Sequence, residues 1–211
     1  MNVQEGNVGN RGDVLKHEAL VAFAELLLAR NPGGVRHVET HAFRLDAPLS
    51  RPWTGTGRYA ELEAPWVAKG RYRCSAGLVA DVLGPAGRLV LAEADPETRA
   101  ALAAQVAAEG LRLELLVEDA LLLASRELPP MAMLVHVDPF DHPARYWPTV
   151  SHLLRWRGDR DAIVVAFAYD RGGPIEWPGA PEGTVAIGAR WDAPYGLAAW
   201  ATRGIAEAAR W

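Results

Sequence analysis

The apolar and polar positions of the chain repeat with two spacings, one typical of helices and one typical of strands. After Asp13 the apolar residues recur every three or four positions, which predicts a helix from Val14 to about Arg30 with Asp13 as its N-cap. Farther along, short and nearly continuous apolar runs are bounded by turn residues, which predicts buried strands. From Arg88 onward the two patterns alternate.

This alternation predicts the order of the elements and the class of the fold. The expected strands cover residues 35–40, 88–93, 113–117, 131–137 and 162–168, followed by about 184–190 and 197–203. Further helices are expected over residues 75–83, 96–109 and 144–157, and a short one after Asp119. Strands that alternate with helices predict an α/β fold with a mostly parallel sheet. A turn at Asp192 predicts that the last two strands form an antiparallel hairpin at the edge of the sheet.

One stretch fits neither pattern. Residues 43–70 are rich in Pro, Gly, Trp and Arg, and we expect them to form a short irregular insertion with little secondary structure. The rest of the 211 residues is continuous in composition, so a single domain over residues 1–211 is expected.

Composition and charge narrow the classes of function. The net charge is −4, so the chain lacks the general basic surface that non-specific nucleic-acid binding requires. Cys74 is the single cysteine, which excludes an internal disulfide and favours the reducing cytoplasm. The chain begins with a polar segment and has no run of about 18 apolar residues, so neither a signal peptide nor contact with a membrane is expected.

Candidate site residues lie where the expected strands end. In an open α/β sheet, ligands bind beyond the carboxyl ends of the strands, and His41, Glu93, Asp119 and Asp138 occupy these places. Glu93 is suited to accept both hydroxyls of a ribose, and Asp119 to accept from an adenine amino group. This arrangement predicts an adenosine-containing ligand. The alternative is that each acid only caps the helix that follows it.

Other adenosine-binding and metal-binding motifs fit less well. No G-x-G-x-x-G follows the first strand, and no Gly-rich loop ends in Gly-Lys-Ser or Gly-Lys-Thr, which excludes the usual dinucleotide fold and nucleotide hydrolysis. His136 and Asp138 share one face of a strand, and with His142 or His152 they match the composition of a non-haem iron triad. A histidine in the core of a buried strand is the simpler interpretation of His136, and no metal is expected.

Six segments occur in the order of the motifs of one known family. They are residues 9–17 (GNRGDVLKH), 39–42 (ETHA), 72–76 (YRCSA), Glu93, 119–120 (DA) and 138–141 (DPFD). They resemble the G-N-x-x-D-V-L-K-H, D-T-H-A-G, Y-x-G-S-P, Glu, Asp-Gly and D-P-P-Y motifs of the RlmJ-type family. That family methylates N6 of an adenine in large-subunit ribosomal RNA with S-adenosylmethionine. The resemblance implies a Rossmann-like class I methyltransferase fold and N-methylation of an amino group, on ribosomal RNA or on a smaller amine.

The resemblance also implies roles for individual residues. Binding of the methyl donor would involve Lys16, His17, His41, Ser75, Glu93, Asp119, Ala120 and Asp138. Catalysis would involve Asp138, Pro139 and Phe140. The Asp138 carboxylate and the Pro139 carbonyl would hold the two hydrogens of the amine and aim its lone pair, since methyl transfer is an in-line displacement that depends on positioning.

The chain departs from the family at several places. Asp141 occupies the position of the aromatic residue that stacks on the target base, so Phe140 or Trp147 would have to replace it. The bulky segment 43–45 stands where the family has small residues. The insertion between the first two strands, about residues 43–70, is shorter than in the family. Residues 1–8 lack the basic and aromatic arm that the family has. Three functions follow as alternatives: a methyltransferase with a smaller or different substrate, a reduced ribosomal RNA enzyme, or an inactive binding or assembly module. Tryptophans crowd the C-terminal third of the chain, where they serve either the core or the interface of a homodimer.

Overall fold

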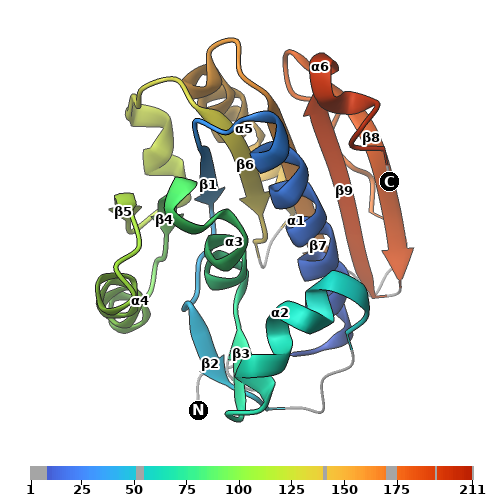
Figure 1. Cartoon of the computed structure of the whole chain (residues 1–211). Helices are drawn as coiled ribbons and strands as arrows, with labels where there is room; N and C mark the ends of the chain where they lie inside the picture. The colour runs from blue at the N-terminus through green and yellow to red at the C-terminus, as the bar shows by residue number, and fades with distance from the viewer. Residues whose placement is uncertain (1–8, 51–54, 140–141, 170–174, 193, 211) are drawn as a thin grey trace.

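A central sheet of seven strands organises the protein in the computed structural model, which describes residues 9–50, 55–139, 142–169, 175–192 and 194–210. The strand order is β5-β4-β1-β6-β7-β9-β8 (Figure 1). The strands are β1 (Val35–Glu39), β4 (Gly87–Ala92), β5 (Leu113–Val117), β6 (Ala132–Val137), β7 (Ala162–Tyr169), β8 (Thr184–Asp192) and β9 (Tyr195–Thr202). The first five are parallel, and β9 is antiparallel to both β7 and β8. The predicted α/β class and the antiparallel edge hairpin are therefore confirmed.

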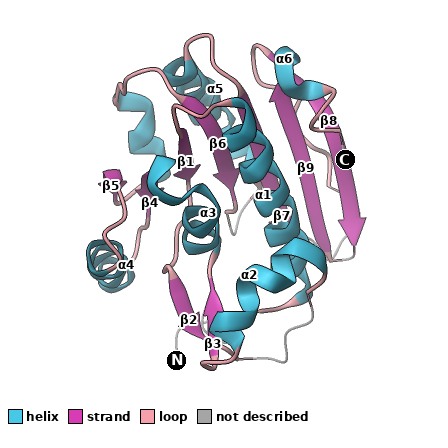
Figure 2. Ribbon diagram, viewed as in Figure 1, coloured by secondary structure: helices cyan, strands magenta, loops and turns pink. Residues whose placement is uncertain are grey.

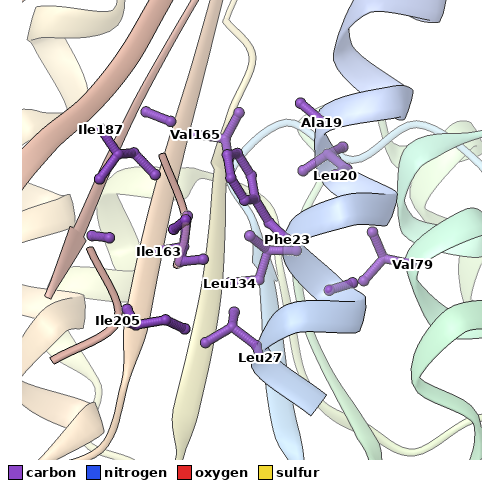
Figure 3. Close-up of a cluster of buried hydrophobic side chains, with 14 of the residues drawn as sticks. Ala19, Leu20, Phe23, Leu27, Val79, Leu134, Ile163, Val165, Ile187 and Ile205 are labelled. Carbon is purple, nitrogen blue, oxygen red and sulfur yellow. The ribbon is translucent and has the colours of Figure 1, made fainter. Parts of the chain in front are cut away.

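Helices cover both faces of this sheet (Figure 2). The α-helices are α1 (Arg11–Arg30), α2 (Gly57–Val67), α3 (Ser75–Leu83), α4 (Pro96–Ala108), α5 (Trp147–Leu153) and α6 (Arg203–Ala206). Short 3-10 helices are η2 (Gly84–Ala86), η3 (Ala120–Ser125), η4 (Pro143–Tyr146) and η5 (Leu154–Arg157). The first core cluster joins α1 and α3 to the sheet, where Phe23 and Leu27 lie against Leu134 and Ile163 (Figure 3). A second cluster joins η3 and α5 to the opposite face.

The first helix begins three residues earlier than its apolar pattern predicts. Asn10 is the N-cap, and its Oδ1 accepts from the amides of Gly12 at 2.7 Å and Asp13 at 3.1 Å. In return, Oδ2 of Asp13 accepts from the Asn10 amide at 3.3 Å. This reciprocal pair is a capping box, so the prediction that Asp13 is the N-cap is wrong. The arrangement leaves Oδ1 of Asp13 directed along the helix toward Lys16, from which it lies 3.1 Å away.

The prediction of an irregular insertion over residues 43–70 is wrong for residues 46–48 and 57–67. The segment contains β2 (Asp46–Pro48) and α2, and β2 pairs antiparallel with β3 (Arg71–Arg73). Pro65 lies in the last turn of α2, where it removes the hydrogen bond that another residue would donate to the Glu61 carbonyl. Tyr59 and Glu63 are buried, and such tertiary contacts stabilise a helix that its local sequence does not favour.

The expected helix over residues 144–157 forms as three short segments, η4, α5 and η5. Pro148 lies in the first turn of α5, where its missing amide hydrogen costs no helical hydrogen bond, and a continuous helix would have placed it in the interior. Among the described residues, no helix combines the length and the apolar composition that a membrane crossing requires.

Candidate functional site

The strand order creates a switch point between β1 and β6. After β1 the chain builds β4 and β5 on one side, and it then returns to place β6 on the other side of β1. The register pairs Glu39 with Leu91 of β4 and with His136 of β6. Two residues farther on, His41, Glu93 and Asp138 therefore come level at the carboxyl ends of three neighbouring strands. Ligands of open α/β sheets bind at such a point.

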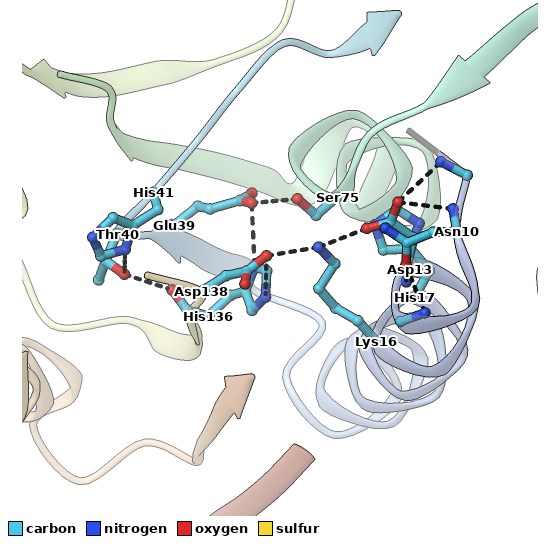
Figure 4. A network of polar contacts seen from close by, with 12 residues as sticks. Asn10, Asp13, Lys16, His17, Glu39, Thr40, His41, Ser75, His136 and Asp138 are labelled. Carbon is cyan, nitrogen blue, oxygen red and sulfur yellow. Dashed lines mark hydrogen bonds and ion pairs between the residues drawn. The ribbon is translucent and has the colours of Figure 1, made fainter. Parts of the chain in front are cut away.

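Lys16 connects α1 to the end of β6 at this point (Figure 4). Its Nζ lies 2.6 Å from Oδ2 of Asp138 and 3.1 Å from Oδ1 of Asp13, and its side chain is only 9% exposed. Burial opposes the charge of Lys16, but the carboxylates of Asp138 and Asp13 outweigh this effect and raise its pKa above the ordinary value. The lysine is therefore a permanent cation, and it holds one oxygen of Asp138 in place.

A buried carboxylate that the sequence did not single out lies beside this ion pair. Glu39 accepts hydrogen bonds from Nδ1 of His136 at 3.1 Å and from Oγ of Ser75 (Figure 4). It also accepts one from Nε2 of His37 at 3.2 Å. Burial alone would raise the pKa of Glu39, but the hydrogen bonds of His136 and His37 hold it well below the ordinary value. Ser75, which the family resemblance assigns to the methyl donor, is thus anchored by an ionised glutamate. The available signal in the sequence was a carboxylate two residues after a histidine in one short apolar strand.

His17 lies between the aromatic rings of two tyrosines. Its Nδ1 is 2.8 Å from the hydroxyl of Tyr72, on which its ring stacks, and Tyr59 meets the ring edge-on at a centroid distance of 5.7 Å. The side chain is buried, and burial lowers its pKa well below the ordinary value, so the imidazole is neutral. His17 therefore joins α1 to α2 and β3, which Figure 1 shows on the side of the sheet where β1 and β6 end.

Glu93 and Asp119 both contact the segment that follows their strand. Oε1 of Glu93 accepts from the Asp95 amide at 2.7 Å, and burial raises the pKa of Glu93 to about 6. Oδ1 of Asp119 accepts from the Leu121 amide at 2.8 Å and caps η3, while the side chain of Ala120 is buried beneath that turn. Asp119 is exposed, and it caps the helix that follows it, as the alternative interpretation of the strand-end acids predicts. Glu93 differs because the residue is buried at the end of β4, next to the switch point.

His41 stands between the ends of β1 and β6. Its Nδ1 lies 2.8 Å from Oγ1 of Thr40, which in turn donates to the carbonyl of His136 at 3.2 Å. The ring of His41 meets Tyr146 edge-on, with 4.5 Å between ring centroids. Beyond His41, where the family has small residues, this chain directs Leu45 into the core beside α3 and α4, and Phe43 packs against the β2–β3 hairpin.

Residues 138–141, which differ from the family's D-P-P-Y motif, are described only in part. Asp138 is partly exposed and Pro139 is buried, whereas Phe140 and Asp141 lie outside the described residues. Trp147, the other candidate for stacking on a substrate, donates from Nε1 to the carbonyl of Gly179 at 2.7 Å and packs on Trp200 at 4.8 Å between centroids. Its ring therefore belongs to the contact between α5 and β9. Within the described ranges, no group of three or more His, Cys, Asp or Glu side chains is arranged to hold a metal ion.

Several solved structures are similar to this chain in fold. No family model matches the chain, and no curated protein sequence matches it. Among solved structures, the chain is similar to a Legionella pneumophila protein of family DUF519, with a TM-score of 0.61 and 15% identity over 92% of this chain and 85% of that one. It is also similar to the putative methyltransferase yhhF of Escherichia coli, with a TM-score of 0.59 and 15% identity over 92% and 89% of the two chains.

A third similar structure is a methyltransferase from Geobacter sulfurreducens, with a TM-score of 0.54 and 14% identity over 93% of this chain and 81% of that one. At such identities the likeness is one of fold. Together with the strand order and the edge hairpin, it shows that this chain has the Rossmann-like fold of the methyltransferases.

Proposed function

We propose that the protein is an S-adenosylmethionine-dependent methyltransferase that methylates an amino group. The observation that carries this proposal is the alignment of His41, Glu93 and Asp138 at the switch point of the sheet. Glu93 fits the ribose of the donor, because its buried carboxylate has a pKa raised to about 6 and two hydroxyl donors would offset that cost. The order of the segments from Gly9 to Pro139 supports a relationship to the RlmJ-type family.

The side chains around Asp138 are suited to hold an amine for in-line attack. The donor would supply a methyl group on a sulfonium. Lys16 fixes Oδ2 of Asp138, which leaves Oδ1 to accept a hydrogen from the amine. The carbonyl of Pro139, the next residue, would accept the second hydrogen. Holding both hydrogens raises electron density on the nitrogen and directs its lone pair, so that positioning lowers the barrier. The acceptor is an adenine of ribosomal RNA or a smaller amine, and the net charge of −4 predicts weak, salt-sensitive binding of RNA.

Titration with the donor tests the proposal directly. We expect calorimetry to detect binding of S-adenosylmethionine and of S-adenosylhomocysteine. Glu93→Ala should weaken both by about 10- to 100-fold, because a charged hydrogen-bond acceptor contributes about 1.5–3 kcal/mol. Below pH 6, protonation of Glu93 should weaken binding to the wild-type protein but not to the variant.

Glu97→Ala provides the matched control, since Glu97 is exposed in the first turn of α4 and should leave the affinity unchanged. Absence of binding of either compound to folded protein would refute the proposal. The binding or assembly module would then be the remaining alternative.

Transfer of the methyl group tests the role of Asp138. With tritiated S-adenosylmethionine and unmethylated large-subunit ribosomal RNA or adenosine monophosphate as acceptors, Asp138→Asn should lower the rate by about 100- to 1000-fold, as expected when a preorganised polar contact to the reacting group is lost. Lys16 keeps Asp13 as a partner in this variant, so the fold should persist in circular dichroism. An unchanged rate would contradict the assignment.

A further inference from the structure

His136 lies next to Asp138 and has no part in the chemistry proposed so far. It is located on β6, two positions before Asp138, and its Nε2 lies 4.0 Å from Oδ2 of that residue. The side chain has no exposed surface. None of the six segments that resemble the family's motifs includes His136, so its presence beside the reacting carboxylate is a feature of this chain.

The contacts of His136 fix which of its ring nitrogens carries a hydrogen. Nδ1 lies 3.1 Å from Oε1 of Glu39 (Figure 4). Because Glu39 is ionised and can only accept, Nδ1 must donate. In the neutral ring, Nε2 then carries a lone pair. Nε2 is buried, and no described residue forms a hydrogen bond with it. An unused basic nitrogen therefore lies beside Asp138.

The charges around this nitrogen favour a proton on His136 over a proton on Asp138. Titratable side chains reach the Glu39–His136 pair from three elements: Glu39 and His37 of β1, Lys16 and His17 of α1, and Asp138 after β6. From β7, the paired residue is the apolar Val165. The permanent cation Lys16 opposes a proton on Asp138 at 2.6 Å, whereas the Glu39 carboxylate would stabilise an imidazolium.

We propose that His136 receives, by way of Asp138, the proton that the acceptor nitrogen loses in methyl transfer. This inference rests on the proposed function. The nitrogen lone pair forms a bond to the methyl carbon, and the carbon–sulfur bond breaks with its electron pair on sulfur. The methylated nitrogen stays positively charged until one N–H bond breaks and leaves its electron pair on nitrogen.

The released proton then passes through two side chains. Asp138 accepts it, and the lone pair of Nε2 of His136 accepts it from Asp138. The 4.0 Å between Nε2 and Oδ2 exceeds a hydrogen bond, and contacts of this kind shorten when the substrate binds. After the product leaves, water takes the proton back through Asp138, whose side chain is partly exposed. His136 thus acts through Asp138 and does not touch the substrate.

The hydrogen on the ring can be located without any acceptor. NMR of protein with ¹⁵N-labelled histidines, saturated with S-adenosylhomocysteine at neutral pH, should show a ring with its hydrogen on Nδ1 and none on Nε2. The variant His136→Asn assigns this signal by its loss. A hydrogen on Nε2 would overturn the proposal, because the lone pair would be occupied. If calorimetry shows no binding of S-adenosylhomocysteine, the proposed function fails instead.

The pH dependence of methyl transfer separates a proton acceptor from a structural residue. His136→Asn keeps an amide donor near the position of Nδ1 for Glu39 and lacks Nε2. With saturating S-adenosylmethionine and the acceptors named above, its rate at neutral pH should be about 100-fold lower. The wild-type rate should fall as the pH is lowered, because Nε2 becomes protonated, and this fall should be absent in the variant.

His37→Gln is the matched control. His37 is equally buried and donates from Nε2 to the same carboxylate at 3.2 Å, and glutamine keeps a donor there. In urea denaturation it should lose about as much stability as His136→Asn, and its rate should keep the pH profile of the wild type. If His136→Asn also keeps that profile, or if both variants lose it alike, His136 has only a structural role and the proposal is refuted.

Discussion

Replacing Arg73 with methionine should lower the free energy of unfolding by about 3 kcal/mol, because it leaves carboxylates without their buried cation. The Arg73 side chain has no exposed surface, and it donates to both oxygens of Asp81 at 2.8 and 2.9 Å and to both oxygens of Glu109 at 2.6 and 2.9 Å. Burial opposes its charge, but the hydrogen bonds of Glu109 and Asp81 outweigh this and raise its pKa. Methionine keeps the volume and removes all four hydrogen bonds.

This arginine joins three elements, which is why the effect should be large. It lies on β3, Asp81 is on α3, and Glu109 ends α4, so the β2–β3 hairpin loses its main polar attachment to the core of the fold. Urea denaturation followed by circular dichroism measures the change. Arg58→Met is the matched control, since Arg58 also pairs with two carboxylates, Glu25 and Glu61, both at 3.0 Å, but on the exposed surface of α2.

The denaturation midpoint of Arg58→Met should stay close to that of the wild type, because ion pairs in water contribute little to stability. Equal shifts in the two variants would show that burial does not govern the contribution of Arg73.

Replacing Lys16 with methionine should lower the free energy of unfolding by about 2–4 kcal/mol. The change leaves Asp13 and Asp138 close together without the cation that separates them, and both carboxylates are largely shielded from water. Removing one of these charges should recover part of the loss. The double variant Lys16→Met with Asp138→Asn should therefore be more stable than Lys16→Met alone.

A double-mutant cycle over the four proteins measures this coupling, since the two side chains are in direct contact. Lys69→Met is the matched control, because Lys69 is exposed and its Nζ lies 5.1 Å from the centre of the Trp66 ring. Within the described residues, Lys69 forms no ion pair with a carboxylate. If Lys16→Met unfolds at the same urea concentration as Lys69→Met, the ion pair at the switch point does not stabilise the fold.

Local sequence was sufficient where an element is defined by its own residues. The apolar runs predicted β4, β5, β6 and β7 nearly to the residue. For β6 and β7 the reason is that a strand buried on both faces must be apolar along its length. Pro96 after Asp95 predicted the start of α4, since proline suits the first helical position and Asp95 caps it through the Thr98 amide at 2.8 Å. The prediction failed for α2, whose stability depends on contacts of Tyr59 and Glu63 with other elements.

The candidate site also combines features that local sequence predicts with features that depend on tertiary contacts. The sequence by itself determined which acids and histidines stand at strand ends, because the end of an apolar run is a local property. Only the tertiary structure decided which of them meet: Lys16 and Asp138 are 122 positions apart, and Glu39 and His136 are 97 apart. Such contacts follow from strand order and register, which depend on the packing of the whole chain around one core and not on the pattern of any single segment.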